Sequence, residues 1–162
     1  IKSIGVSNFN VSHLERIKQL GLKLPAINQI EFHCFNYDNQ TKKILKYCKE
    51  NSITIEAYSP LARAHKMCKE NKILKELASK YSNDNNVLTW AHIMLKWCLQ
   101  KDVVILPKSV TESRISANAN VFEFTISNDD MDRIDNITNE NNSYYCSWQN
   151  NNITHPYKVE WD

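Results

Sequence analysis

Polar residues recur where the β-prone stretches of this chain end, and their types suit the binding of a phosphorylated ligand. The pairs are Ser7-Asn8, Asn28-Gln29, Tyr58-Ser59 and Lys108-Ser109, and Arg114 and Asn118 follow the last of them. Arg114 and Asn118 are four residues apart, so they share one face of a helix. If that helix begins near Thr111, its unpaired first-turn N–H groups lie beside two cations and a hydroxyl, which suits a phosphate monoester. The alternative from spacing alone is a surface helix with an exposed arginine.

The remaining polar pairs also have plain structural interpretations. Ser7-Asn8 is compatible with a turn, and Asn28-Gln29 is compatible with a satisfied polar pair inside a strand. Tyr58 is compatible with a core position and Lys108 with a solvated charge. Their repetition at equivalent strand ends favours one common binding site.

The elements that must position these residues alternate along the chain. Strands are expected at Ile1–Val6, Pro25–Phe32, Ile53–Tyr58 and Val103–Leu106. Helices are expected at 11–20, 38–50, 72–81, 87–100, 112–119 and 129–138, the last with Ser127 as its N-cap, while 63–69 is expected to be a loop. Strands that alternate with helices predict parallel pairing through right-handed crossovers, and therefore an α/β protein.

The glycine content decides between two α/β architectures. A doubly wound dinucleotide-binding sheet needs a Gly-x-Gly-x-x-Gly turn, and the only glycines are Gly5 and Gly21. Four strand-helix units are instead half of a parallel (β/α)8 TIM barrel, in which functional residues lie at the C-terminal ends of the strands. We expect residues 1–138 to form the half-barrel and residues 139–162 to be a C-terminal tail of the same domain.

Composition excludes several classes of function. The 162 residues suit one domain, and 42% hydrophobic residues are enough to build a core. A net charge of +2 with interspersed signs predicts neither nucleic acid nor a membrane surface as a partner. No apolar run approaches the roughly 20 residues that cross a bilayer.

Cysteine and histidine placement indicates a cytoplasmic protein without a metal site. The five cysteines are scattered and odd in number, which predicts reduced thiols, and no histidine pair stands at metal-ligand spacing. The first residue, Ile1, already lies inside an expected strand, so we expect the sequence to be part of a longer chain.

Four motifs together resemble the aldo-keto reductases. They are Gly5-Val-Ser-Asn-Phe9, Pro25-Ala-Ile-Asn-Gln-Ile-Glu31, Ala57-Tyr-Ser-Pro-Leu61 and Ile105-Leu-Pro-Lys-Ser-Val-Thr-Glu-Ser-Arg-Ile115, in the family's order and at about its spacing. The resemblance covers nearly the whole chain and corresponds to the C-terminal half of the family's barrel. It implies an NADPH-dependent oxidoreductase that reduces aldehydes or ketones to alcohols.

The resemblance also implies a role for each matching residue in binding NADPH or NADP+. Ser7, Asn8 and Gln29 would bind the nicotinamide carboxamide, while Tyr58 would stack on the ring. Ser59 and Leu61 would lie along the pyrophosphate. Lys108, Ser109 and Arg114 would hold the 2′-phosphate, and Asn118 would bind the adenine edge.

Three departures from the family pattern limit these implications. Ala117 stands where a glutamate usually approaches adenine, so we expect adenine to be held less specifically. The segment after Leu61 is short, and Arg63 is expected to be plain loop rather than a pyrophosphate ligand. The family's catalytic aspartate, tyrosine, lysine and histidine belong to the first half of the barrel, so this chain alone is expected to be inactive.

Two functional interpretations remain open from sequence. The first is the cofactor-binding part of a reductase acting on a small-molecule carbonyl substrate. The alternative is a non-catalytic half-barrel module that binds NADPH or a protein. In both, Ile4, Ile30 and Ile55, or their strand neighbours, lack facing layers, so the missing N-terminal half or a second copy of the chain should pair along Ile1–Val6 and Val103–Leu106. In the tail, Tyr144, Trp148 and Tyr157 would form either a substrate-pocket wall or outer packing.

Overall fold

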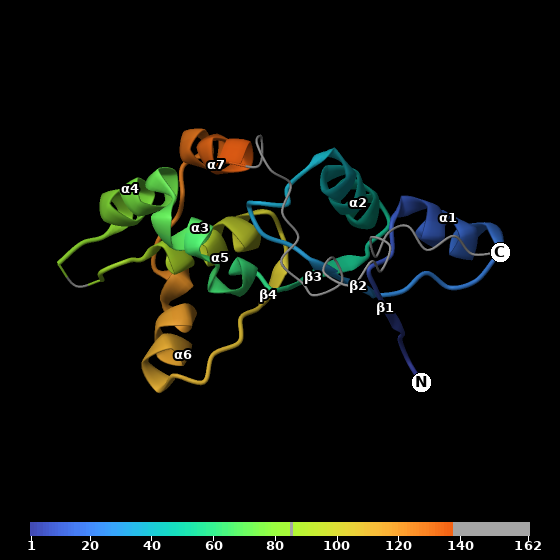
Figure 1. Ribbon diagram of the computed structural model, residues 1–162. Helices are drawn as coiled ribbons and strands as arrows, with labels where there is room; N and C mark the ends of the chain where they lie inside the picture. The colour runs from blue at the N-terminus through green and yellow to red at the C-terminus, as the bar shows by residue number, and fades with distance from the viewer. Residues whose placement is uncertain (85, 138–162) are drawn as a thin grey trace.

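Four parallel strands form the sheet on which the rest of the chain is arranged. The computed structural model describes residues 1–84 and 86–137; the tail residues Tyr144, Trp148 and Tyr157 lie outside them. The strands are β1 (Gly5–Ser7), β2 (Ile27–Glu31), β3 (Thr54–Tyr58) and β4 (Val104–Leu106), and they pair in the order β1-β2-β3-β4 (Figure 1). The expected parallel α/β arrangement is therefore confirmed, with each of the four strands shorter than predicted.

Helices connect the strands and follow the last of them. They are α1 (Val11–Gln19), α2 (Asn39–Glu50), α3 (Lys66–Glu70), α4 (Lys72–Tyr81), α5 (Trp90–Gln100), α6 (Glu112–Ala119) and α7 (Asn128–Asp135), with 3-10 turns at Ala62–Ala64 and Asn120–Phe122. Side chains cap several of them, as Asp38 accepts from Thr41 N at 2.7 Å to begin α2 and Ser127 accepts from Asp130 N at 3.3 Å to begin α7. The predicted N-cap Ser127 is thus confirmed.

Two helical segments differ from the prediction. The expected loop 63–69 contains α3, whose first turn is capped by the His65 side chain accepting from Met67 N at 3.4 Å. A histidine cap is not among the common N-cap residue types, so the pattern did not reveal it. The expected helix 87–100 begins only at Trp90, because Thr89 takes the N-cap position.

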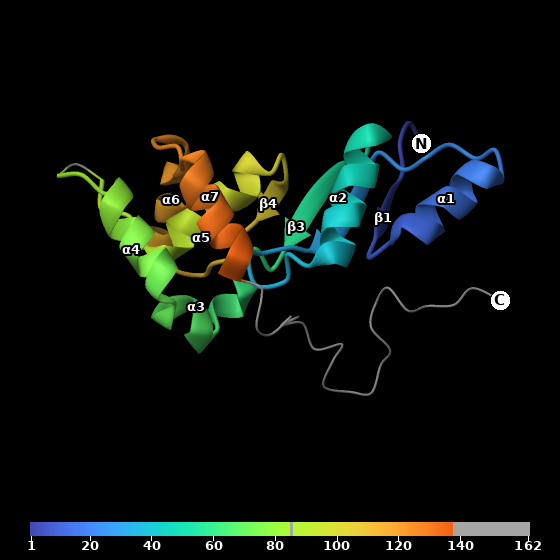
Figure 2. The ribbon, with the colours of Figure 1, turned by 90° about the horizontal axis from the view of Figure 1, so that it is seen from above.

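The sheet has one face covered by helices and one face open. Ile30 and Ile55 are buried beneath the helices, and Figures 1 and 2 show α1 and α2 along one side of the strands. Val104 and Leu106 point the other way and are 45% and 41% exposed. Of the alternatives left by the sequence, Ile30 and Ile55 are covered, whereas Ile4, which is 50% exposed, and the strand neighbours on the open face are uncovered.

The described cysteines are buried thiols. Cys34, Cys48, Cys68 and Cys98 are all buried. Burial raises the pKa of the Cys48 and Cys68 thiols to about 11, so both are protonated at neutral pH. They act as small apolar groups of the core rather than as nucleophiles.

A buried carboxylate joins α4 to α7. Asp130 accepts from Lys80 at 2.6 Å and from the Tyr81 hydroxyl at 2.7 Å, and its other oxygen accepts from Arg133 at 3.1 Å. These donors hold the pKa of Asp130 well below its usual range. The network therefore fixes α7 against α4 through charge-assisted hydrogen bonds.

We predict that Asp130→Asn lowers the free energy of unfolding by about 1–3 kcal/mol at pH 7, because Lys80, Tyr81 and Arg133 lose the charge of the buried carboxylate that accepts from all three. A carboxyl whose pKa is lower in the folded state stabilises that state. Its contribution is complete above the unfolded pKa of about 3.9 and decreases as pH falls below that value. The difference between the two proteins should therefore begin to shrink as pH falls below about 4 and keep shrinking toward the much lower folded-state pKa, as measured by urea denaturation at a series of pH values. Asp129→Asn, at the exposed neighbouring position, is the control, and an equal loss in both variants would refute the assignment.

Candidate functional site

The ends of β1, β2 and β3 bring four of the predicted site residues together. Ser7 Oγ donates to the carbonyl oxygen of Gln29 at 2.9 Å, and the backbone N–H of Asn8 donates to the same oxygen at 2.9 Å. The Tyr58 hydroxyl donates to Asn8 Oδ1 at 3.0 Å. Residues from three separate strands thus form one polar group at the C-terminal edge of the sheet.

Asn8 adopts a backbone conformation that few residues accept. Its φ is 59°, in the left-handed region that asparagine tolerates better than most side chains. The chain beyond it is held by the buried Asn28, which accepts from Phe9 N at 3.2 Å and donates to Phe9 O at 2.8 Å. Asn28 is therefore a support for the turn, which agrees with its plain structural interpretation.

Gln29 has a partner that the sequence reasoning did not identify. Its Nε2 donates to Glu56 Oε2 at 3.0 Å. An ionised carboxylate only accepts, so Glu56 fixes the amide with its nitrogen toward β3 and turns Oε1 the other way. The signal for Glu56 was its position two residues before Tyr58, which places both side chains on the open face of β3.

A second group of predicted residues surrounds a pocket beyond β3 and β4. This pocket has a volume of about 350 Å³, and Leu61, Lys108, Ser109, Arg114 and Asn118 line it. The described residues around it include three cations, with Lys69 as the third, and no carboxylate. Such a pocket attracts anions.

The start of α6 is organised by Ser109. Its Oγ accepts from Thr111 N at 3.1 Å, and Thr111 O accepts from Arg114 N at 3.0 Å as the helix begins. The predicted start of the helix near Thr111 is confirmed, since Thr111 is the N-cap residue. The structure also shows that Arg114 and Asn118 both face the pocket.

The segment after Tyr58 turns in a left-handed conformation. Ser59, Ala62, Arg63 and Ala64 all have φ between 46° and 54°, and Ser59 O accepts from Ala62 N at 2.8 Å. Leu61 and Ala64 reach the pocket, whereas Ser59 and Arg63 are outside its lining. Non-glycine residues in this region cost about 1–3 kcal/mol each, so the surrounding contacts must hold this turn in place.

Trp90 and His92 also line the pocket, and the sequence reasoning missed both. They lie in the first turn of α5, and neither residue is near a strand end in the sequence. Burial lowers the pKa of His92, so the ring is neutral at pH 7. Their only sequence signal was a Thr89-to-His92 spacing that fits a capping box.

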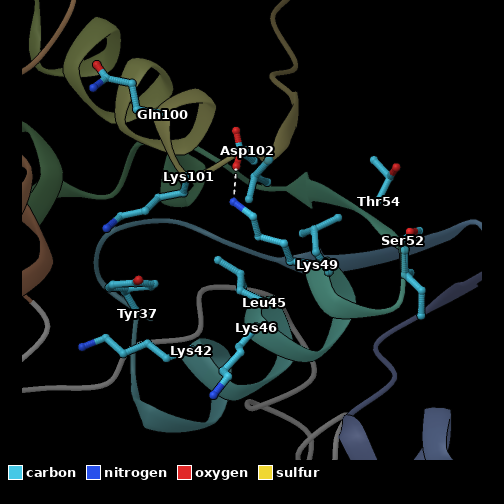
Figure 3. Close-up of a pocket in the computed structure, with 13 residues that line it drawn as sticks. Tyr37, Lys42, Leu45, Lys46, Lys49, Ser52, Thr54, Gln100, Lys101 and Asp102 are labelled. Carbon is cyan, nitrogen blue, oxygen red and sulfur yellow. Dashed lines mark hydrogen bonds and ion pairs between the residues drawn. The ribbon is translucent and has the colours of Figure 1, made fainter.

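A larger hollow lies at the opposite end of β3. Figure 3 shows this pocket of about 650 Å³, around which Lys42, Lys46, Lys49 and Lys101 gather. Ion pairs already engage Lys49 with Asp102 and Lys101 with Asp135, both at 2.7 Å. Because barrel sites occupy the C-terminal ends of strands, position favours the smaller pocket over this one.

None of the described His, Cys, Asp and Glu side chains form a group of three or more placed to hold a metal ion. Within residues 1–84 and 86–137, no helix is long and apolar enough to cross a membrane.

Fold and site together define part of a parallel α/β barrel with an anion-attracting pocket at the C-terminal ends of its strands. The sequence profile of the Aldo/keto reductase family matches residues 1–139. The chain therefore belongs to the aldo/keto reductase family.

Curated relatives and solved structures agree with this assignment. The chain is 40% identical over 141 residues to the glyoxal reductase of Bacillus subtilis, and 37% identical over 134 residues to the methylglyoxal reductase DkgA of Escherichia coli. These matches cover 86% and 83% of this chain but 47% and 46% of the relatives. The chain thus spans about half the length of the curated relatives it matches.

The backbone is similar to that of solved family members. An aldo-keto reductase from a Medee basin deep-sea metagenome library has a TM-score of 0.73 and 36% identity, and the match covers 84% of this chain and 48% of that one. An aldo-keto reductase of the silkworm Bombyx mori has a TM-score of 0.77 and 26% identity, covering 99% and 48%.

We predict that Asn28→Ala lowers the free energy of unfolding by about 1–3 kcal/mol, because both backbone groups of Phe9 lose their partner. Urea denaturation measures the effect. Asn120→Ala, which removes an exposed asparagine, is the matched control. A loss no greater than that of the control would show that Asn28 does not support the turn.

Proposed function

We propose that this chain is the cofactor-binding part of a carbonyl reductase that uses NADPH. The observation that carries the proposal is the pocket beside α6, where Lys108, Ser109 and Arg114 meet around a hollow whose described lining has no carboxylate. Such a set of donors suits the dianionic 2′-phosphate that distinguishes NADPH from NADH. The residues present therefore fit the cofactor that the family resemblance implies.

The adenine end of the cofactor would extend along the same wall. Asn118 lies one turn beyond Arg114 and offers an amide that can both donate to and accept from an adenine edge. Ala117 leaves this wall without the carboxylate that many family members have, so adenine is recognised less specifically. Affinity at this end depends mainly on the phosphate contacts.

The nicotinamide end would lie at the polar group on the strand ends. The hydroxyl of Tyr58 donates to Asn8 Oδ1. The Asn8 amide nitrogen is therefore the donor available to a carboxamide oxygen of the cofactor. Gln29 Oε1, turned away from Glu56, suits a carboxamide N–H. The Tyr58 ring offers a flat surface for stacking, and Ser7 completes the set of polar side chains.

The connecting turn would carry the pyrophosphate between these two ends. Ser59 and Leu61 belong to the left-handed turn that leads from the strand ends to the pocket. When bound, NADPH supplies the hydride that reduces a carbonyl carbon. This chain's residues then fix which face of the nicotinamide is presented, and the proton donor comes from the catalytic tetrad of the rest of the barrel.

The names of the relatives support small aldehydes as substrates. They include a glyoxal reductase and a methylglyoxal reductase. The open sheet face and the edge strands β1 and β4 need a partner, for which the N-terminal half of the barrel is the first candidate and a second copy of the chain the other.

We predict that Arg114→Ala weakens NADPH binding by about 10- to 150-fold, the equivalent of roughly 1.5–3 kcal/mol for hydrogen bonds to a charged group. NADH binding should stay unchanged, because NADH lacks the 2′-phosphate. Titrations followed by nicotinamide fluorescence measure both affinities. Arg16→Ala, an exposed arginine on α1, is the control, and equal binding of the two cofactors by the unaltered protein would refute the phosphate assignment.

A second prediction concerns turnover. The 162-residue chain alone should not oxidise NADPH in the presence of methylglyoxal, because it has no catalytic tetrad. A protein that also contains the N-terminal half of the barrel should do so, as followed by absorbance of NADPH. Measurable turnover by the chain alone would contradict the assignment of the proton donor to the other half.

A further inference from the structure

Helix α6 carries the phosphate ligand Arg114 without being anchored by its own side chains. None of its residues is buried, and Ile115, its largest apolar side chain, is 56% exposed. Figure 1 shows α6 set off from the sheet at the end of the segment that leaves β4. Core packing within the helix therefore does not fix where the guanidinium stands, and other contacts must do so.

His92 provides such a contact. Its Nδ1 lies 2.9 Å from Thr89 N, and its Nε2 lies 3.0 Å from the carbonyl oxygen of Ala117 on α6. A backbone N–H can only donate, so Nδ1 accepts and Nε2 carries the hydrogen that it donates to Ala117. His92 is 6% exposed, and its lowered pKa favours the neutral form that this arrangement requires.

The position of Ala117 makes this bond relevant to the cofactor. Ala117 lies between Arg114 and Asn118 on α6, and all three line the same pocket as His92. The imidazole thus joins the first turn of α5, which is part of the buried core, to the part of α6 that faces the ligand. A shift of α6 would move both of its ligand-facing side chains together.

We propose that His92 is a positioning residue that sets the preference of the site for NADPH over NADH by holding α6 against α5. The inference rests on the proposed function of this pocket. His92 acts through α6, so its loss weakens the phosphate contacts of Arg114 and leaves the nicotinamide end unchanged.

A simpler role is capping of α5 alone, and variants separate the two. His92→Ala removes both hydrogen bonds. His92→Gln keeps an acceptor for Thr89 N and a donor for Ala117 O, because the amide oxygen and nitrogen are spaced like the two ring nitrogens. Asp38→Ala removes the N-cap of α2, remote from the pocket, and reports what a comparable loss of stability does by itself.

The experiment is a fluorescence titration of NADPH and NADH against these variants and Arg114→Ala. We expect His92→Ala to weaken NADPH binding by about threefold to tenfold, as for one neutral hydrogen bond, and NADH binding by a smaller factor, because on α6 the two cofactors share only the adenine contact of Asn118. We expect His92→Gln and Asp38→Ala to bind both cofactors as the unaltered protein does.

The outcomes distinguish this inference from the function on which it rests. If Arg114→Ala weakens NADPH selectively but His92→Ala changes neither cofactor, or both equally, the positioning role is wrong. Failure of His92→Gln to restore selectivity also overturns it. If Arg114→Ala leaves NADPH binding unchanged, the proposed function of the pocket fails first.

Discussion

Parallel pairing in one register is the constraint on which the site depends. Ser7 pairs with Gln29, Gln29 with Glu56 and Glu56 with Val104, so these residues form one row across all four strands. Side chains in such a row point to the same face of the sheet. A slip of one residue in any strand would turn its polar group toward the helices, where no water compensates it.

The covered face of the sheet provides the burial of apolar side chains that the polar row on the other face does not. Ile30, Ile55 and Ala57 lie in the alternate positions and pack beneath α2 and α5 with the aromatic residues Phe32 and Trp97, whose ring centroids are 5.0 Å apart. Burial of these side chains stabilises the sheet, while the open face contributes little. Structure and ligand chemistry are thus divided between the two faces of the same strands.

Much of the fold and part of the site could be predicted from the sequence because they depend on local patterns. The strand and helix order followed from periodicity, and the start of α6 near Thr111 followed from the motif around Lys108 and Ser109. The sequence did not predict which face of the sheet is covered, because a short apolar strand carries apolar residues on both of its faces. For that reason the sequence left open whether Ile30 and Ile55 or their strand neighbours are uncovered.

Contacts between segments that are distant in the chain could not be predicted from the sequence pattern. Glu56 meets Gln29 across 27 residues, and His92 meets Ala117 across 25. A polar residue in a helix or strand looks the same whether its partner is water or another element, so only the folded arrangement distinguishes them.

The absence of buried side chains on α6 also bears on how such proteins diversify. Substitutions on a helix that contributes nothing to the core change ligand contacts without a large loss of folding free energy. If α6 holds the cofactor as proposed, substitutions along it can change which dinucleotide is preferred while the sheet keeps its folding stability.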